Sequence, residues 1–203
     1  PNEVTEDAMR LPEARKSGAV SLEEALNRRR SIRSYSSEPV TLEELSQLLW
    51  AAQGITGKNG FRAAPSAGAT YPLETYVIIG DVVGLEPGFY RYEPANHSLA
   101  LLKKGDMRPV ILDATLSQPC IKSAAVILVF TAVYERTTER YGDRGKMYVH
   151  MDVGFAAENA LLQVAALSLA SVPVGAFRTK TLGNLLGLPE SELPMCLLPI
   201  GRP

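Results

Sequence analysis

Apolar residues recur every three or four positions in the segment TLEELSQLLWAAQ, which begins at Thr41. Its apolar side consists of Leu42, Leu45, Leu48, Leu49 and Ala52. This spacing places them on one face of a helix. Thr41 and Glu44 form a capping box at the start, and Gly54 provides a stop at the end. A second box, the SLEE sequence at 21–24, predicts a short helix through about residue 28.

Other segments have the patterns of strands. Residues 73–80 alternate between apolar and polar side chains, and 88–94 and 98–103 read as a hairpin around a turn at 94–96. The apolar run at 124–133 predicts a strand buried on both faces. Further strands are predicted at 172–177 and 195–201, with helices at about 106–115, 146–171 and 181–187. Because these elements follow no strict βαβ period, the predicted class is α+β.

Length and composition narrow the class of protein. The 203 residues predict one domain over 1–203, of which 1–20 form an extended N-terminal arm. A net charge of −1 argues against binding nucleic acid through bulk charge. Cys120 and Cys196 lie far apart, which favours a reducing, cytoplasmic setting. The first thirty residues contain no signal-peptide pattern, and polar residues interrupt the most apolar helix, so we expect no membrane span.

Several common site motifs are missing. The sequence has no GxGxxG after a strand and no GxxxxGK[ST]. His97 and His150 have no metal-ligand spacing, so no metal site is predicted. Cys120 with His150 is conceivable as a nucleophile and its base, but two incidental residues explain them as well. We assign no catalytic residue.

The segment RRRSIRSY at 28–35 has two interpretations. Arginines at the end of a helix offset its dipole, which explains the triplet but not Arg33. If the chain is extended from Arg29, then Arg29, Ser31 and Arg33 lie on one side with a period of two. Two guanidinium groups and a hydroxyl suit a phosphate. RNA binding is disfavoured by the near-neutral charge and by the lack of interleaved aromatic residues.

Two further segments are poor in side-chain bulk. PSAGATYPLE at 65–74 lies between a predicted helix and a predicted strand, and VPVGAF at 172–177 has small residues at Gly175 and Ala176, near the end of its predicted strand. Backbone without bulk allows a flat ligand to approach closely. The alternative for the first segment is an ordinary connector rich in Pro and Gly.

Taken together, RRRSIRSY, ELSQLLWAAQGIT, PSAGATYPLE, VPVGAF and LLPIGRP resemble the nitroreductase superfamily of FMN flavoproteins, most closely its SagB-type thiazoline/oxazoline dehydrogenase branch. The resemblance covers about Leu11 to Pro203. It implies a mostly antiparallel central sheet flanked by helices and an intertwined homodimer with FMN at the subunit interface.

The resemblance also implies the cofactor-binding residues. The Arg-x-Ser-x-Arg motif corresponds to Arg29, Arg30, Ser31 and Arg33 and would bind the phosphate, ribityl chain and pyrimidine edge. The remaining implied contacts are Pro65, Ser66, Ala67 and Gly68 from the partner subunit, Gln118, Pro173, Gly175 and Ala176 at the ring, and Arg202 at the phosphate. Ala69 stands where the family usually has asparagine, which removes one hydrogen bond to the flavin.

The implied activity is that of an FMN-dependent oxidoreductase, with NAD(P)H as the implied electron donor or with the flavin cycling through another acceptor. A nitro compound, a quinone or an azoline is the implied small-molecule substrate. Tyr141 and Arg144 are candidates for lining the pocket, although such residues are more often structural or solvated. The alternatives are an FMN-binding protein without turnover and a dehydrogenase subunit of a peptide-modifying complex.

Overall fold

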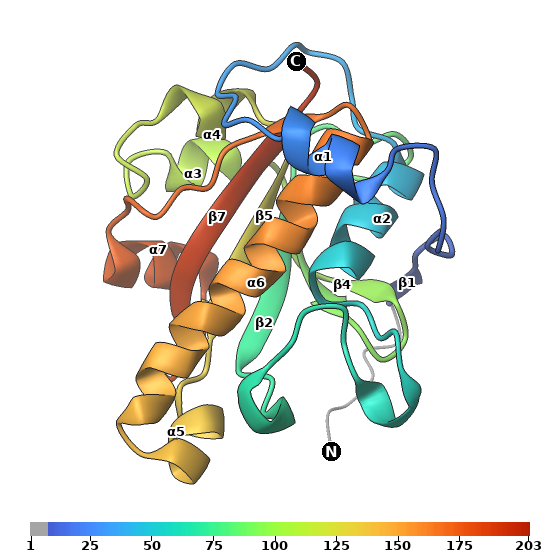
Figure 1. The fold of residues 1–203 in the computed structure, drawn as a ribbon. Helices are drawn as coiled ribbons and strands as arrows, with labels where there is room; N and C mark the ends of the chain where they lie inside the picture. The colour runs from blue at the N-terminus through green and yellow to red at the C-terminus, as the bar shows by residue number, and fades with distance from the viewer. Residues whose placement is uncertain (1–7) are drawn as a thin grey trace.

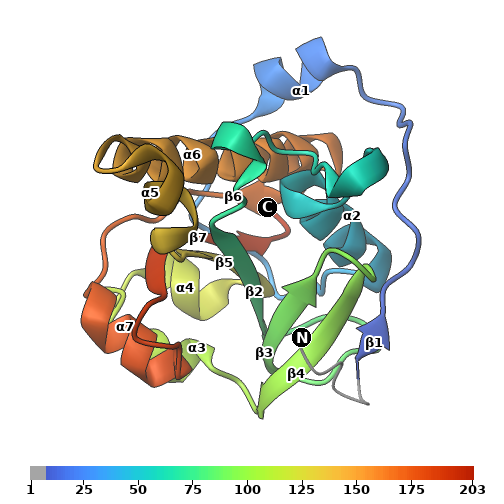
Figure 2. The same ribbon diagram turned by 90° about the horizontal axis from the view of Figure 1, so that it is seen from below.

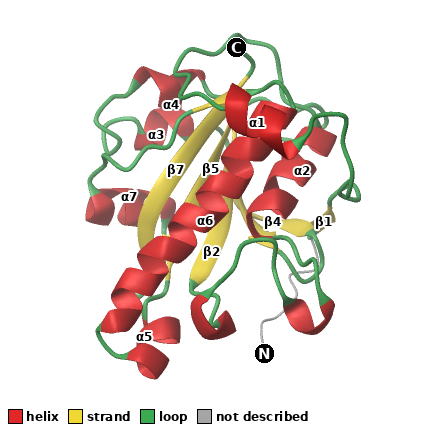
Figure 3. Cartoon of the chain, in the orientation of Figure 1, coloured by secondary structure: helices red, strands yellow, loops and turns green. Residues whose placement is uncertain are grey.

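The computed structural model describes residues 8–203 and contains one seven-stranded sheet with helices on both faces (Figures 1 and 3). The strand order is β1-β4-β3-β2-β5-β7-β6, and every pairing between neighbouring strands is antiparallel. The strands are β1 (Met9–Arg10), β2 (Leu73–Ile79), β3 (Gly88–Glu93), β4 (Ser98–Lys104), β5 (Val126–Ala132), β6 (Ala170–Ser171) and β7 (Leu193–Gly201). The predicted α+β class with a mostly antiparallel sheet is confirmed.

Two layers of helices cover the sheet. The helices are α1 (Leu22–Arg28), α2 (Leu42–Gln53), α3 (Arg108–Ile111), α4 (Pro119–Ser123), α5 (Glu135–Tyr141), α6 (Arg144–Ala166) and α7 (Thr179–Leu186). Figure 2 shows α2 and α6 on one face and α3, α4 and α7 on the other. Strand β5 supplies both cores, because Leu128 packs with the first layer while Ile127 and Val129 pack with the second. Its predicted burial on both faces is confirmed.

The capping signals place the first two helices correctly. At α2 the Thr41 hydroxyl accepts from the Glu44 N–H, and the Glu44 carboxylate accepts from the Thr41 N–H. At α1 only half of the box forms: Ser21 accepts from the Glu24 N–H, while the Glu24 carboxylate pairs with Arg28. No helix within residues 8–203 is long and apolar enough to cross a membrane.

Three predicted elements differ from the structure. The helix predicted at 106–115 is only the four residues of α3. The helix predicted at 146–171 ends at Ala166, because Ser168 takes a positive φ of 56° and turns the chain into β6. The strand predicted at 172–177 is absent apart from a bridge between Val174 and Leu197. Pro173 has no N–H for a ladder, which explains why the pairing with β7 is interrupted there.

Residues 8–20 form no helix and run along the body of the protein. The Gln47 side chain accepts from the Arg15 N–H and donates to the Arg15 carbonyl. Near the start, the Leu11 N–H donates to the His97 carbonyl. These contacts fit the predicted extended arm over this range, whereas residues 1–7 lie outside the part that the structure describes.

Candidate functional site

The RRRSIRSY segment leaves α1 in an extended conformation and lies against the edge of the sheet. The C-cap of α1, Arg29, has φ −52° and ψ 121°. The Ile32 N–H then donates to the Ser171 carbonyl over 2.9 Å, and Ser31 forms a parallel bridge with Ser171. The Tyr35 hydroxyl donates to the Pro199 carbonyl over 2.9 Å, which fixes the end of the segment to β7. The arginines are therefore displayed from a well-anchored backbone.

A cavity of about 220 Å³ opens beside the arginine triplet. Its walls are Arg28, Arg29, Arg30, Ile32 and Pro203 on one side, and Leu161, Val164, Ala165, Ser168 and Leu169 on the other. No Asp or Glu side chain lines it, so an anion there would meet guanidinium groups and, apart from Ser168, apolar side chains. The Glu158 carboxylate lies 3.8 Å from the Arg29 Nε at the margin. The cavity beside the arginines suits a phosphate attached to a less polar group.

The stretch from Pro173 to Ala176, which is exposed except at Val174, leaves backbone donors free. Val174 exchanges two backbone hydrogen bonds with Leu197 of β7, at 2.8 and 3.0 Å. Beyond it, the N–H groups of Gly175 and Ala176 donate to no other backbone carbonyl within residues 8–203. A Cβ at Gly175 would meet no atom within 4 Å. The Gln118 side chain donates to the Ala176 carbonyl over 2.9 Å and holds the stretch in place. Such a surface fits the edge of a flat ring.

The loop at 65–69, which contains the turn η2 (Ala67–Ala69), is fixed from below by helix α6. The Ser66 hydroxyl donates to the Asp152 carboxylate over 2.6 Å and accepts from the Tyr71 N–H over 3.0 Å. Asp152 is only 3% exposed. Burial raises the pKa of this carboxyl, while the hydrogen bonds from Ser66 and from the Ala67 N–H lower it. The Ser66 side chain therefore has an internal partner and points to α6.

Gly68 is small for reasons internal to the chain. Its φ is 59°, in the left-handed region that favours glycine. A Cβ there would also lie 2.4 Å from the Tyr141 hydroxyl. Pro65 and Ala69 are exposed, and Ala67 is half-buried. Ala69 also takes a positive φ of 54°, which restricts its side chain, so room for a ligand is needed only at Pro65 and Ala67 to explain their small size.

Arg202 is engaged by carboxylates. Its guanidinium contacts Glu44 at 2.9 and 3.0 Å and Glu38 at 3.0 Å. A phosphate would have to displace one of these partners, so the predicted role of Arg202 has no geometric support in this arrangement.

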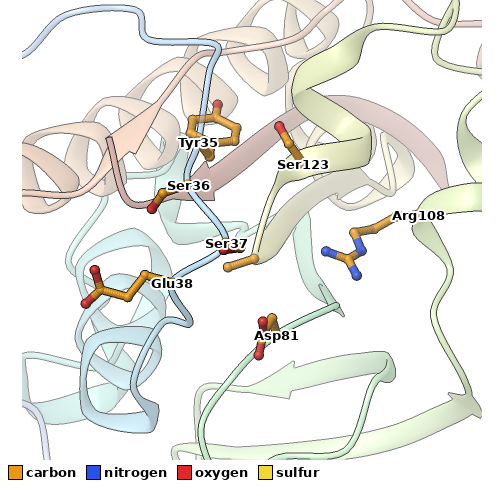
Figure 4. A pocket seen from close by; sticks show the side chains of 8 residues that line it. Tyr35, Ser36, Ser37, Glu38, Asp81, Arg108 and Ser123 are labelled. Atoms are coloured by element: carbon orange, nitrogen blue, oxygen red, sulfur yellow. The ribbon is translucent and has the colours of Figure 1, made fainter.

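A cavity of about 330 Å³ lies between Tyr35–Glu38 and the start of β5 (Figure 4). Besides Tyr35, Ser36, Ser37 and Glu38, it is lined by Asp81, Arg108, Ser123 and Ala125. It contains none of the predicted ligand residues. Its one arginine, Arg108, is occupied by the Asp106 carboxylate and the Ala124 carbonyl. Because the other charged lining residues are carboxylates, the cavity is poorly suited to a phosphate.

The structure brings the predicted residues together in two groups. The first group joins 29–33 to the 171–176 stretch through Ser171, and Gln118 through Ala176. The second group is the 65–69 loop, which rests on Asp152 and on the end of α5. In Figure 1, α1 crosses the upper end of α6, whereas the green 65–72 loop lies toward its lower end. One chain therefore does not assemble both groups around a single ligand.

Sequence reasoning missed Asp152 and Arg140, which hold the 65–69 loop. Both lie more than seventy residues from it in sequence, and no local motif marks them. The structure gives no support for Cys120 as a nucleophile with His150 as its base. Burial raises the pKa of the Cys120 thiol, and the His150 Nε2 faces the Tyr134 hydroxyl at 2.7 Å. Among the described residues, no group of three or more His, Cys, Asp or Glu could hold a metal ion.

Comparison with known proteins identifies the family. Residues 26–202 match the nitroreductase family. A protein of Methanocaldococcus jannaschii, provisionally named nitroreductase MJ1384, is 46% identical over 183 residues, which are 90% of this chain and 91% of that protein. The crystal structure of a provisionally named nitroreductase from Ralstonia eutropha JMP134 superposes with a TM-score of 0.82 at 31% identity, covering 96% of this chain and 89% of that one.

More distant relatives have more specific names. The FMN reductase [NAD(P)H] of Bacillus subtilis is 28% identical over 193 residues, which are 88% of this chain and 64% of that protein. The trifolitoxin-processing protein TfxB of Rhizobium leguminosarum is 29% identical over 119 residues, 56% of this chain but only 32% of that protein. The extent of the family match and the close relative together show that this chain belongs to the nitroreductase family.

Proposed function

We propose that this member of the nitroreductase family is an FMN-dependent oxidoreductase that works as a homodimer, with each flavin bound between two chains. The observation that carries the proposal is the division of the predicted ligand residues into two groups that one chain keeps apart. The relationship to an FMN reductase supports the cofactor. Bound FMN would supply the hydride-transfer chemistry.

The residues of the first group fit FMN in charge and shape. Arg29 and Arg30 border the cavity that no Asp or Glu side chain lines, where they would hold the phosphate. Arg33 would lie at the pyrimidine edge, where a fixed positive charge stabilises developing negative charge. The free N–H groups of Gly175 and Ala176 would orient the ring edge. Ser31 would bind the ribityl chain, and the 65–69 loop of a second chain would cover the ring.

An apolar strip on α6 supports the dimer. Met147, Met151 and Phe155 recur at intervals of four residues, with exposures of 37%, 45% and 46%. On neighbouring α1, Leu22 and Leu26 are 62% and 52% exposed. Exposed apolar side chains that recur along one helix in this way are typical of an interface. Since α6 also carries Asp152 under the 65–69 loop, pairing through α6 would bring that loop toward the partner chain.

The proposal also specifies an electron donor and a class of substrate. We propose NAD(P)H as donor because the related B. subtilis protein is named for it. A nitro compound or a quinone would accept the electrons. If an azoline is oxidised instead, the azoline would be the electron donor and a separate acceptor would reoxidise the flavin. The two distant free cysteines support a reducing, cytoplasmic setting.

The decisive experiment compares FMN with riboflavin, which lacks the phosphate. Arg29→Ala should weaken FMN binding roughly ten- to a hundredfold, the equivalent of one charge-assisted hydrogen bond, and leave riboflavin binding unchanged. Arg33→Ala should weaken both. Arg10→Ala, a change at an exposed arginine of β1, should affect neither. Fluorescence quenching measures each affinity. Equal wild-type affinity for FMN and riboflavin would remove the phosphate site from the proposal.

The similarity to TfxB favours a second candidate, a dehydrogenase subunit of a peptide-modifying complex. Co-purification with a cyclodehydratase-like partner would support it. The absorbance spectrum with and without NAD(P)H separates an NAD(P)H-dependent reductase from a protein that binds FMN without turnover, because only the reductase bleaches the bound flavin on adding NAD(P)H.

A further inference from the structure

A corner of two arginines and two tyrosines adjoins the 65–69 loop, at the junction of α5 and α6. The Arg140 guanidinium lies 5.4 Å from the centre of the Tyr141 ring, and that of Arg144 lies 5.7 Å from the Tyr148 ring. The two tyrosine rings meet edge to face, 5.2 Å apart. We call these four residues the Arg-Tyr corner. The aromatic contacts limit the freedom of both cations.

The corner is joined directly to the loop that would cover the flavin. Arg140 donates to the Gly68 carbonyl over 3.1 Å, and the Tyr141 hydroxyl occupies the space beside Gly68 where a side chain would stand. A ligand resting on the exposed side of this loop would therefore have Arg140 and Tyr141 as neighbours.

The charge of the corner is not compensated within the described chain. Neighbouring cations have partners: Arg136 pairs with Glu74, and Lys146 pairs with Asp143. Within residues 8–203, no carboxylate lies within 4 Å of the guanidinium of Arg140 or Arg144. Both arginines are exposed. An exposed arginine on an ordinary solvated surface does not require a tyrosine ring beneath its guanidinium group, as both of these have.

We propose that the Arg-Tyr corner selects a ligand in which an anionic group is attached to a planar ring, and specifically an aromatic substrate bearing a carboxylate. This inference rests on the proposed function, because it places the corner beside the flavin of the partner chain. The guanidinium groups would bind the carboxylate, and the tyrosines would contact the ring. The phosphates of a nicotinamide dinucleotide offer the same anionic chemistry, so the test includes that source.

The test measures binding rather than turnover. Isothermal titration calorimetry of the FMN-loaded protein with benzoate and with benzamide, which has nearly the same shape but no charge, should show at least roughly tenfold tighter binding of benzoate. Arg140→Gln and Arg144→Gln should each weaken benzoate binding by about that factor and leave benzamide unchanged. Lys146→Gln, at a neighbouring exposed cation already paired with Asp143, is the matched control and should change neither.

Several results would overturn the inference. Equal binding of benzoate and benzamide by the wild type would remove the anion site. Arginine variants that weaken NADPH but not benzoate would assign the corner to the dinucleotide. Melting temperatures check the fold of each variant, and Arg140→Lys should retain part of the benzoate binding. If the protein takes up no FMN, the proposed function fails, whereas the same titration of the flavin-free protein still tests the corner.

Discussion

The hydrogen bond between Ser66 and Asp152 should contribute substantially to folding, whether or not a flavin is bound. Ser66→Ala removes a donor 2.6 Å from a carboxylate that is 3% exposed, and it removes the acceptor of the Tyr71 N–H. A hydrogen bond to a charged group contributes about 1.5–3 kcal/mol, and a neutral one about 0.5–1.5 kcal/mol. The expected loss in the free energy of unfolding is therefore about 2–4.5 kcal/mol.

A double-mutant cycle isolates this pair. Asp152→Ala alone should lower the free energy of unfolding by less than the removal of a typical buried polar side chain. The reason is that burial of this carboxylate is itself unfavourable, as its raised pKa indicates. In the Asp152→Ala background, Ser66→Ala should be milder by about 1.5–3 kcal/mol. Urea unfolding of the flavin-free protein measures all four forms. Ser123→Ala, whose hydroxyl makes an exposed 3.3 Å contact to Pro119, is the control and should cost under about 0.5 kcal/mol.

The pH dependence gives a further check on the same pair. The folded-state pKa of Asp152 is raised, so its stabilising contribution is present at low pH and is lost as pH rises through that pKa. The hydrogen bond from Ser66 lowers the pKa of Asp152, so Ser66→Ala should raise that pKa further. The cost of Ser66→Ala should thus be largest at neutral pH and shrink on acidification. Additive costs in the cycle that do not change with pH would refute the assignment.

Three other predictions follow from single contacts. Gly68→Ala should destabilise the flavin-free protein by about 1–2 kcal/mol, because φ is 59° and the new Cβ would crowd the Tyr141 hydroxyl; urea unfolding without flavin detects this. Burial lowers the pKa of His97, whose Nδ1 lies 2.8 Å from the Tyr92 hydroxyl. Wild-type stability should therefore fall as pH drops below about 6.5 and His97→Gln should flatten that slope, as urea titrations at several pH values can show. Met151→Glu, in the exposed strip of α6, should convert a dimer into a monomer by light scattering, and an unchanged mass would exclude this strip as the interface.

Local signals predicted the elements whose causes are local. The capping box of Thr41 and Glu44 forms as expected, and the apolar run of β5 is buried on both faces. The strand predicted at 172–177 is wrong because its apolar residues suggest a strand, whereas Pro173 cannot donate to a ladder. The helix predicted at 146–171 is too long at its C-terminal end because nothing in the composition around Ser168 indicates the left-handed turn there.

Contacts between residues that are far apart in the chain could not be predicted from local sequence patterns. The guanidinium of Arg202 is paired with Glu38 and Glu44, which lie more than 150 residues earlier in the chain. From its position alone, Arg202 looked available for a phosphate. The charge of a residue is visible in the sequence, but whether that charge is already neutralised depends on the fold.

The 65–69 loop shows why a small-residue motif has more than one cause. Gly68 is required by backbone conformation and by Tyr141, and Ser66 is required by Asp152. Neither residue needs a flavin to explain it. Ala69 is restricted by its positive φ of 54°. The internal contacts do not explain the small size of Pro65 and Ala67, and their lack of bulk is what a flat ligand would require. Internal contacts therefore shape the loop, and its remaining small residues provide the surface on which the proposed flavin of the partner chain would rest.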